Sequence, residues 1–174
     1  MYKPDNEHFG NHTIPSFLFF KISTFHTFKA VLLLRKIFPM LTNLLPRDAL
    51  LLTGRVLLAG LFLVIGWGKL ADFPAAVSYM IQTGAPVPTL SAILAIVVEL
   101  GAGLALLGGI LVEPIAIVLA LYTIVTGLIG HHFWTTSGML RYDMMIHFYK
   151  NISIAGGLLA LAAAGAGRFA IRLR

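Results

Sequence analysis

The sequence predicts an all-α integral membrane protein, folded as an antiparallel bundle of four transmembrane helices. Of its 174 residues, 58% are hydrophobic and only 11% are charged, and the mean hydropathy is +0.88. Soluble domains carry roughly 25% charged residues, because charged side chains solvate their surface. Too few polar groups remain here to cover a core in water, so lipid is the expected solvent.

Four apolar stretches carry this prediction, each close to the roughly 20 residues that a helix needs to cross the hydrocarbon core. They cover residues 49–68, 89–109, 114–133 and 146–164. Residues 110–113 are the whole connection between the second and third stretches, so these two helices are expected to run antiparallel. The polar residues 134–145 are expected to join the third span to the fourth.

The connection between the first two spans contains structural breakers. Asp72 follows the first span, and residues 84–88 read Gly-Ala-Pro-Val-Pro. Between them, residues 75–83 are predicted to form a short helix at the membrane interface.

The basic residues indicate the orientation of the bundle, because lysines and arginines that flank a span stay on the cytoplasmic side. They precede the first span and follow the last, at Arg35, Lys36, Arg47, Arg168, Arg172 and Arg174. Both termini are therefore predicted to be cytoplasmic. The formal net charge of +6 is interpreted as this topology signal. No nucleic-acid site is expected, because the cations do not cluster with aromatic residues.

Residues 1–39 differ from the rest of the chain. Their apolar stretch, residues 17–38, is interrupted by four basic residues and is a poor span. Three interpretations stay open: a basic amphipathic surface helix, an organellar targeting sequence, or a translated extension upstream of a start at Met40. The predicted organisation is an extension of residues 1–39 outside the fold and a four-helix membrane domain of residues 40–174.

Ionisable side chains inside the predicted spans cost at least roughly 2.5 kcal/mol each to insert, so each needs a partner or a function. Lys69 follows Arg55 by 14 residues, so both face the same neighbour if the first helix continues that far. Glu99 lies near the middle of the second span among small residues that allow close helix approach. We therefore expect Glu99 to face protein rather than lipid.

More polar groups end the third span and begin the fourth. His147, Lys150 and Asn151 follow one another at i, i+3 and i+4, which places them on one helix face. An up-and-down bundle brings them to the same end as Lys69, with Arg55 and Glu99 deeper. The predicted polar cluster in the outer half of the bundle is Arg55, Lys69, Glu99, His131, His132, His147, Lys150 and Asn151.

Three interpretations of this cluster remain open. The side chains could pair with one another and only fix the helix register, or they could form a small-molecule or proton-handling site. Alternatively, Arg55 and Glu99 could line a permeation path for a small solute, which would require an oligomer. A metal site is not expected, because the lysines repel a cation and no His-Glu-x-x-His motif is present. Without cysteine, the chain carries no disulfide, thiolate metal site or dithiol relay.

Five short motifs resemble the DoxX family of small bacterial inner-membrane proteins. They are Gly54-Arg55, residues 66–70 with Phe73, residues 98–104, residues 131–134 and residues 145–151. Together they cover about residues 50–167 and follow the family's order on the corresponding spans. The sequence departs from the family at His132, where relatives usually carry an acidic or polar residue before Phe-Trp.

The resemblance implies a four-helix bundle in the bacterial inner (plasma) membrane. Some relatives are associated with a membrane thiosulfate:quinone oxidoreductase, and others with oxidoreductase complexes that resist oxidative and thiol stress, although most have no established activity. By this analogy the chain is expected to be a subunit of a membrane oxidoreductase system whose polar cluster binds an anionic or quinone-like ligand. Electrons would have to come through a quinone or a partner protein.

Each residue of the cluster then has an expected role. Lys69 and Lys150 would supply positive charge to the ligand. His131 or His147 would transfer protons near neutral pH. Glu99 would act as a buried proton acceptor.

Overall fold

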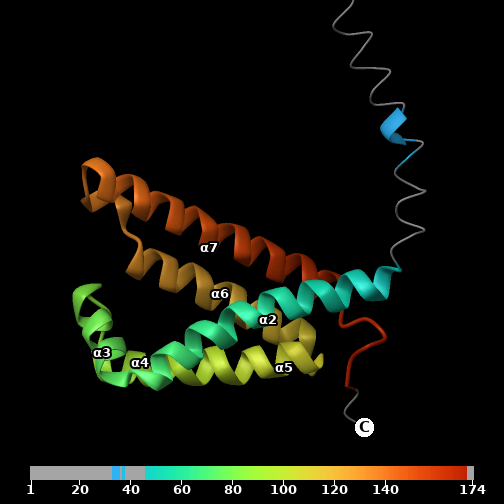
Figure 1. Cartoon of the computed structure of the whole chain (residues 1–174), viewed down its shortest axis with the longest axis horizontal. Helices are drawn as coiled ribbons and strands as arrows, with labels where there is room; N and C mark the ends of the chain where they lie inside the picture. The colour runs from blue at the N-terminus through green and yellow to red at the C-terminus, as the bar shows by residue number, and fades with distance from the viewer. Residues whose placement is uncertain (1–32, 36, 38–45, 172–174) are drawn as a thin grey trace, which may run out of the picture. The chain divides into compact units, whose positions relative to one another are not determined.

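The computed structural model describes residues 33–35, 37 and 46–171 (Figure 1). The chain divides into two units after Leu45. In the first unit, the described residues 33–35 and 37 are helical and their side chains are exposed. The other predictions for residues 1–39 fall outside the described residues.

The described part of the chain contains four helical segments long and apolar enough to cross a membrane, which confirms the predicted all-α fold. The first is α2 (Arg47–Ala71). The second consists of α4 (Pro88–Val97), a π-helical turn η1 (Val98–Ala102) and α5 (Gly103–Gly108). The third is α6 (Val112–Gly130), which leads into the 3-10 turn η2 (Phe133–Thr135), and the fourth is α7 (Gly138–Ala164).

The short helix predicted between the first two spans is present as α3 (Phe73–Gln82). Asp72 begins it, because its Oδ1 accepts a hydrogen bond from the backbone N–H of Ala75 at 3.1 Å. Such an N-cap satisfies one of the amide groups that a helix start leaves unpaired. Pro74 suits the first turn, where its missing N–H costs nothing.

The fourth helix begins at Gly138, eight residues before the predicted start at residue 146. Polar residues such as Arg141 and Asp143 led to the prediction of a loop there. Both side chains are exposed, and no residue between Gly138 and residue 146 breaks a helix. The prediction placed the start of the helix at the start of the apolar run, whereas α7 begins before that run.

The spans form two packed groups (Figure 1). One group is the antiparallel hairpin of α6 and α7, and the other contains α2 packed against α4, η1 and α5. The two groups diverge toward the end of the bundle where α3 lies. At the other end, the first and last spans meet, because Arg47 Nη2 donates to the backbone oxygen of Ala164 at 2.8 Å. Both of these spans therefore have their outer termini on one face of the bundle.

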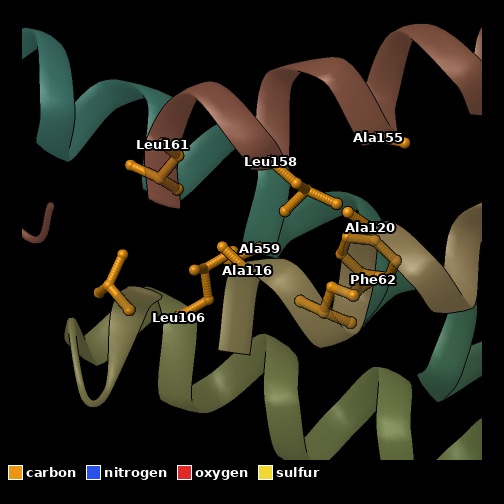
Figure 2. Packing of buried hydrophobic residues seen from close by; sticks show 10 residues of the cluster. Ala59, Phe62, Leu106, Ala116, Ala120, Ala155, Leu158 and Leu161 are labelled. Carbon is orange, nitrogen blue, oxygen red and sulfur yellow. The ribbon is translucent and has the colours of Figure 1, made fainter. Parts of the chain in front are cut away.

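The buried core lies where the groups converge (Figure 2). Side chains of α2, α5, α6 and α7 meet there, and several of them are alanines, which let the helix backbones approach closely. The labelled members are Ala59, Phe62, Leu106, Ala116, Ala120, Ala155, Leu158 and Leu161. This packing closes one half of the bundle and leaves the α3 end more open.

Candidate functional site

A cavity of about 650 Å³ lies at the α3 end, with walls from α2, α3, α4, η1, α6 and α7. Most of its lining is apolar, as in sites for small organic molecules, which typically enclose roughly 300–1,000 Å³. The minority of polar side chains among its lining includes Lys69, Glu99, Tyr122, Thr123, Thr126, His131 and Asn151.

Three helices meet at Glu99, which borders this cavity. Lys69 Nζ donates to Glu99 Oε1 and Oε2 at 2.8 and 2.7 Å. Tyr122 Oη donates to Glu99 Oε1 at 2.7 Å. Glu99 is only 5% exposed, which confirms that it faces protein. The carboxylate thus joins α2 to α6, and its charge is balanced by one lysine.

Tyr122 did not emerge from the sequence as a candidate. A signal was available, because a tyrosine deep in a span lies far from the interfacial aromatic belts and its hydroxyl needs a partner when buried. Tyr122 also precedes Thr126 by four residues, so the two share one face of α6.

The approach of α2 to Glu99 depends on a glycine. A Cβ added at Gly66 would lie 2.9 Å from Glu99 Cβ and 3.0 Å from the side chain of Leu100. Glu99 lies in η1, a π-helical turn. Such turns insert an extra residue into a helix and occur frequently at functional sites. Gly66 and η1 together allow the carboxylate to reach both Lys69 and Tyr122.

Two of the three candidate histidines lie together. The rings of His131 and His147 stack with their centroids 5.0 Å apart. His131 lines the cavity, and its buried Nδ1 has no hydrogen-bond partner in the described part of the chain. His132 instead places Nδ1 2.9 Å from the backbone oxygen of Ile129. Of the adjacent residues His131 and His132, His131 is therefore the one that faces inward.

The three polar residues at the start of the fourth apolar run, His147, Lys150 and Asn151, do not all lie at the cavity. Asn151 lines the cavity and packs against α6, since a Cβ at Gly127 would lie 3.0 Å from Asn151 Nδ2. His147 is exposed apart from its stacking on His131. Lys150 is exposed beside Tyr149 and Ser153 and does not line the cavity.

Helix α3 lines the end of the cavity. Tyr79 lines it, and a Cβ at Gly130 would lie 3.0 Å from Tyr79 Oη, so the α3 tyrosine touches the end of α6. Partial burial raises the pKa of Tyr79, because burial disfavours the phenolate. Its hydroxyl therefore remains a neutral group at the α3 end of the cavity.

Arg55 lies at the opposite end of the bundle and does not line the cavity. It is 1% exposed. Its guanidinium donates to four backbone oxygens, those of Leu106, Leu107, Ala166 and Phe169, at 2.7–3.2 Å. Arg55 thus ties the end of α5 to the segment that follows α7. As predicted, it faces the same helical segment as Lys69.

No three histidine, aspartate or glutamate side chains gather closely enough to hold a metal ion within residues 33–35, 37 and 46–171. Lys69 already occupies both oxygens of Glu99. The chemistry that the site offers is hydrogen bonding and proton exchange beside an apolar space.

Comparison with known proteins gives one family and two relatives. The family model described as DoxX matches residues 50–132, which include Arg55, Lys69, Glu99, Tyr122 and His131. The chain is 39% identical over 128 residues to the inner membrane protein YphA of Escherichia coli (strain K12), covering 74% of this chain and 91% of that protein. It is 35% identical over 124 residues to the inner membrane protein YqjF of the same strain, covering 71% and 90%. No solved structure matches the chain.

Proposed function

Since this chain belongs to the DoxX family, we propose that it is the ligand-binding membrane subunit of an oxidoreductase system and holds a quinone-like molecule in the α3-end cavity. It is an integral membrane protein with four apolar spans, and its two relatives are inner membrane proteins. The observation that carries the proposal is the largely apolar cavity of about 650 Å³ beside one cluster of hydrogen-bonding groups.

Charge balance favours a neutral ligand over an anion. Lys69 and Glu99 form a direct pair at 2.7 Å, so their charges compensate and no net positive charge remains to attract an anion. Lys150, the other lysine expected to supply charge, does not line the cavity. A ring that carries carbonyl or hydroxyl oxygens fits this environment better, because it needs hydrogen bonds rather than a counter-charge.

The residues at the cavity have hydrogen-bonding capacity to spare. An ammonium group has three donors, and Glu99 takes two from Lys69, which leaves one for a ligand carbonyl. Tyr122 donates to Glu99, and its oxygen can still accept. His131 Nδ1 is a third group without a partner in the described structure. These atoms can bind a carbonyl oxygen and a hydroxyl group on one ring.

Electrons have to come from a partner protein, because the chain has no cysteine and none of its other motifs is typical of a redox centre. A quinone becomes a quinol when it takes up two electrons and two protons. In this proposal the partner supplies the electrons, and the stacked pair of His131 and exposed His147 connects the cavity with water for the protons. Placement of both termini in the cytoplasm, from the flanking basic residues, would put this end on the periplasmic side.

The direct Lys69–Glu99 pair supports a second candidate function, a purely structural role in which interhelical pairs hold the bundle together. A permeation path receives less support, because buried core residues such as Leu106 and Leu119 fill the other half of the bundle. Binding and structure can be separated by a variant that removes one hydrogen bond of the site and leaves the ion pair intact.

Tyr122→Phe is that variant, and ubiquinone-1 in lipid nanodiscs is the probe. We expect Tyr122→Phe to weaken equilibrium binding by about threefold to tenfold, as the loss of a single hydrogen bond does. The control Tyr142→Phe removes a hydroxyl from an exposed tyrosine of α7 that does not line the cavity, and it should leave binding unchanged. Absence of ubiquinone-1 binding by the unaltered protein, or equal affinities of the two variants, would overturn the proposal.

A further inference from the structure

We propose that the cavity opens sideways into the bilayer between α4 and α6, and that its ligand carries a long apolar tail that lies in this opening. The inference rests on the proposed function, because the polar head of the ligand is placed against Lys69 and Tyr122. It adds the class of ligand, a lipid-soluble amphiphile, and the route by which that ligand enters.

The rim of the opening consists of residues that border both the cavity and the surroundings of the protein. Leu94 of α4 and Val125 of α6 line the cavity and are nevertheless 54% and 51% exposed. Among the described helices, α4 packs against α2 and α3, and α6 packs against α7, but α4 and α6 do not form a packed pair. The backbones of α4 and α6 therefore do not pack together across this gap.

The wall between α2 and α7 differs from this gap. Leu61 and Ile65 of α2 also line the cavity and are 36% and 43% exposed, less than Leu94 and Val125. They share a helix face with Leu58, which lies three and seven residues before them. Leu58 contacts α7, where a Cβ at Gly157 would lie 3.9 Å from its Cδ2. Packing between α2 and α7 thus narrows this side at the depth of Leu58, next to the buried core.

The opening lies at the depth of the hydrocarbon. Leu94 follows Pro88 by six residues and Val125 precedes Gly130 by five, so both lie about 8–9 Å inside the ends of their antiparallel helices, at 1.5 Å per residue. Each of these spans is long enough to cross the membrane. Acyl or isoprenoid chains surround a protein at this depth, and a polar solute would not enter there.

The polar cluster lies within reach of a head group that enters by this route. Tyr122 is one helical turn from Val125 on the same helix, about 4.5 Å along its axis. Tyr122 contacts Glu99, so the head would meet the hydrogen-bonding groups directly behind the rim. The alternative entrance at the α3 end is narrowed by the contact of Tyr79 with Gly130. A ligand that enters from the bilayer and leaves its tail between α4 and α6 fits both the position of Tyr122 behind the rim and the narrowed entrance at the α3 end.

The test compares ubiquinone-1 with ubiquinone-8 in nanodiscs, with both concentrations expressed per lipid. Leu94→Trp/Val125→Trp should obstruct the rim and weaken binding of ubiquinone-8 by roughly fivefold or more, because its tail must be displaced. Binding of ubiquinone-1 should change less than about twofold. The matched control Ile93→Trp/Leu121→Trp alters exposed residues of the same two helices that do not line the cavity. It should leave both affinities unchanged.

A second measurement covers the case in which the tryptophan variant does not fold. Because the chain has no cysteine of its own, Leu94→Cys/Val125→Cys can be cross-linked specifically with bis-maleimides of increasing length. Cross-linking should slow exchange of ubiquinone-8 more than exchange of ubiquinone-1, in the same protein sample before and after reaction.

The outcomes are distinguishable. If the unaltered protein binds no ubiquinone-1, both the proposed function and the opening are overturned. If ubiquinone-1 binds but obstruction or cross-linking affects the two quinones equally, the opening is overturned and the proposed function stands. A change of oligomeric mass in Leu94→Trp/Val125→Trp but not in its control would show instead that this gap is an interface between copies of the chain, and would also overturn the opening.

Discussion

Arg55 and Lys69 are two basic residues on one face of α2, about 21 Å apart along the helix axis, and their surroundings differ. Arg55 is 1% exposed and uses four N–H groups on backbone oxygens of α5 and the segment after α7. Lys69 binds one carboxylate and borders a cavity. One region has nearly all of its hydrogen-bonding capacity satisfied, and the other does not.

This difference separates a structural group from a candidate site more clearly than charge or depth does. No space remains beside Arg55, because a Cβ at Gly109 would lie 2.8 Å from Arg55 Cζ. Gly109 also has φ of 78°, a conformation that favours glycine. At the Lys69 end, a donor of Lys69 and His131 Nδ1 both remain available next to apolar space. The comparison predicts that substitutions at the first end affect stability and those at the second affect binding.

The largest expected effect is on Arg55. Arg55→Leu would leave four buried or partly buried carbonyl oxygens without a donor, so we expect the protein to lose about 3–5 kcal/mol of stability, with a lower melting temperature in detergent and lower abundance. Arg47→Leu is the control, because exposed Arg47 donates to a single carbonyl, and it should cost less than about 1 kcal/mol.

Ubiquinone-1 binding provides the second readout for Arg55. At temperatures where Arg55→Leu remains folded, its affinity should match that of the unaltered protein, because Arg55 does not line the cavity. Selective loss of binding in a variant with unchanged melting temperature would contradict the assignment of Arg55 as a structural group.

The Arg55 region also shows which features a sequence can predict. The 14-residue spacing predicted that Arg55 and Lys69 face one neighbour, and both contact the second span. The identity of the Arg55 partners could not be predicted, because they are backbone oxygens and leave no mark on the side-chain pattern. The last four backbone oxygens of any helix lack partners within the helix whatever the sequence, so only the fold can select among them.

Gly66→Ala is expected to have an intermediate effect on stability, at the Lys69 end of the bundle. In Gly66→Ala the new Cβ would meet Glu99 Cβ at 2.9 Å, which forces α2 away from η1 and should cost about 1–3 kcal/mol. The control Gly54→Ala adds a methyl group on the same helix with nothing within 4 Å. It should be neutral or slightly stabilising, by up to about 1 kcal/mol, because alanine favours helix.

Calorimetric or thermal-shift measurements can be combined with ubiquinone-1 binding for this pair. Gly66→Ala should weaken binding as well, since it displaces Glu99 from Tyr122, whereas Gly54→Ala should not. Equal behaviour of the two variants would show that the close approach at η1 is not required for the site.

The α3 end illustrates where sequence reasoning stops. Apolar runs predicted the four spans, because these follow from transfer into lipid. The breakers at Asp72 and residues 84–88 predicted the short helix between the first two spans. The cavity could not be predicted, since it depends on how far α6 and α7 diverge from α2 and α4, a property of packing that no periodicity reports. The π-helical turn at Glu99 could not be predicted either. The π-helical turn changes the register of the helix, so ideal helical spacing does not predict it.

The smallest stability effect, and the sharpest test of the comparison, concerns the Lys69–Glu99 pair. Glu99→Gln leaves the Lys69 ammonium without its counter-charge, but the lysine side chain retains 17% exposure. The cost should therefore be about 1–2 kcal/mol, below that of a fully buried broken pair. Lys69→Met/Glu99→Gln removes both charges, and its melting temperature should return close to that of the unaltered protein, since the two residues are in direct contact and their effects are not additive. If the pair is only structural, the double variant should regain both the melting temperature and the ubiquinone-1 affinity of the unaltered protein. If Lys69 also binds the ligand, the melting temperature should recover while ubiquinone-1 binding stays weakened by about threefold to tenfold, because the lysine donor is gone. Full recovery of binding in the double variant would assign this pair to the same structural class as Arg55.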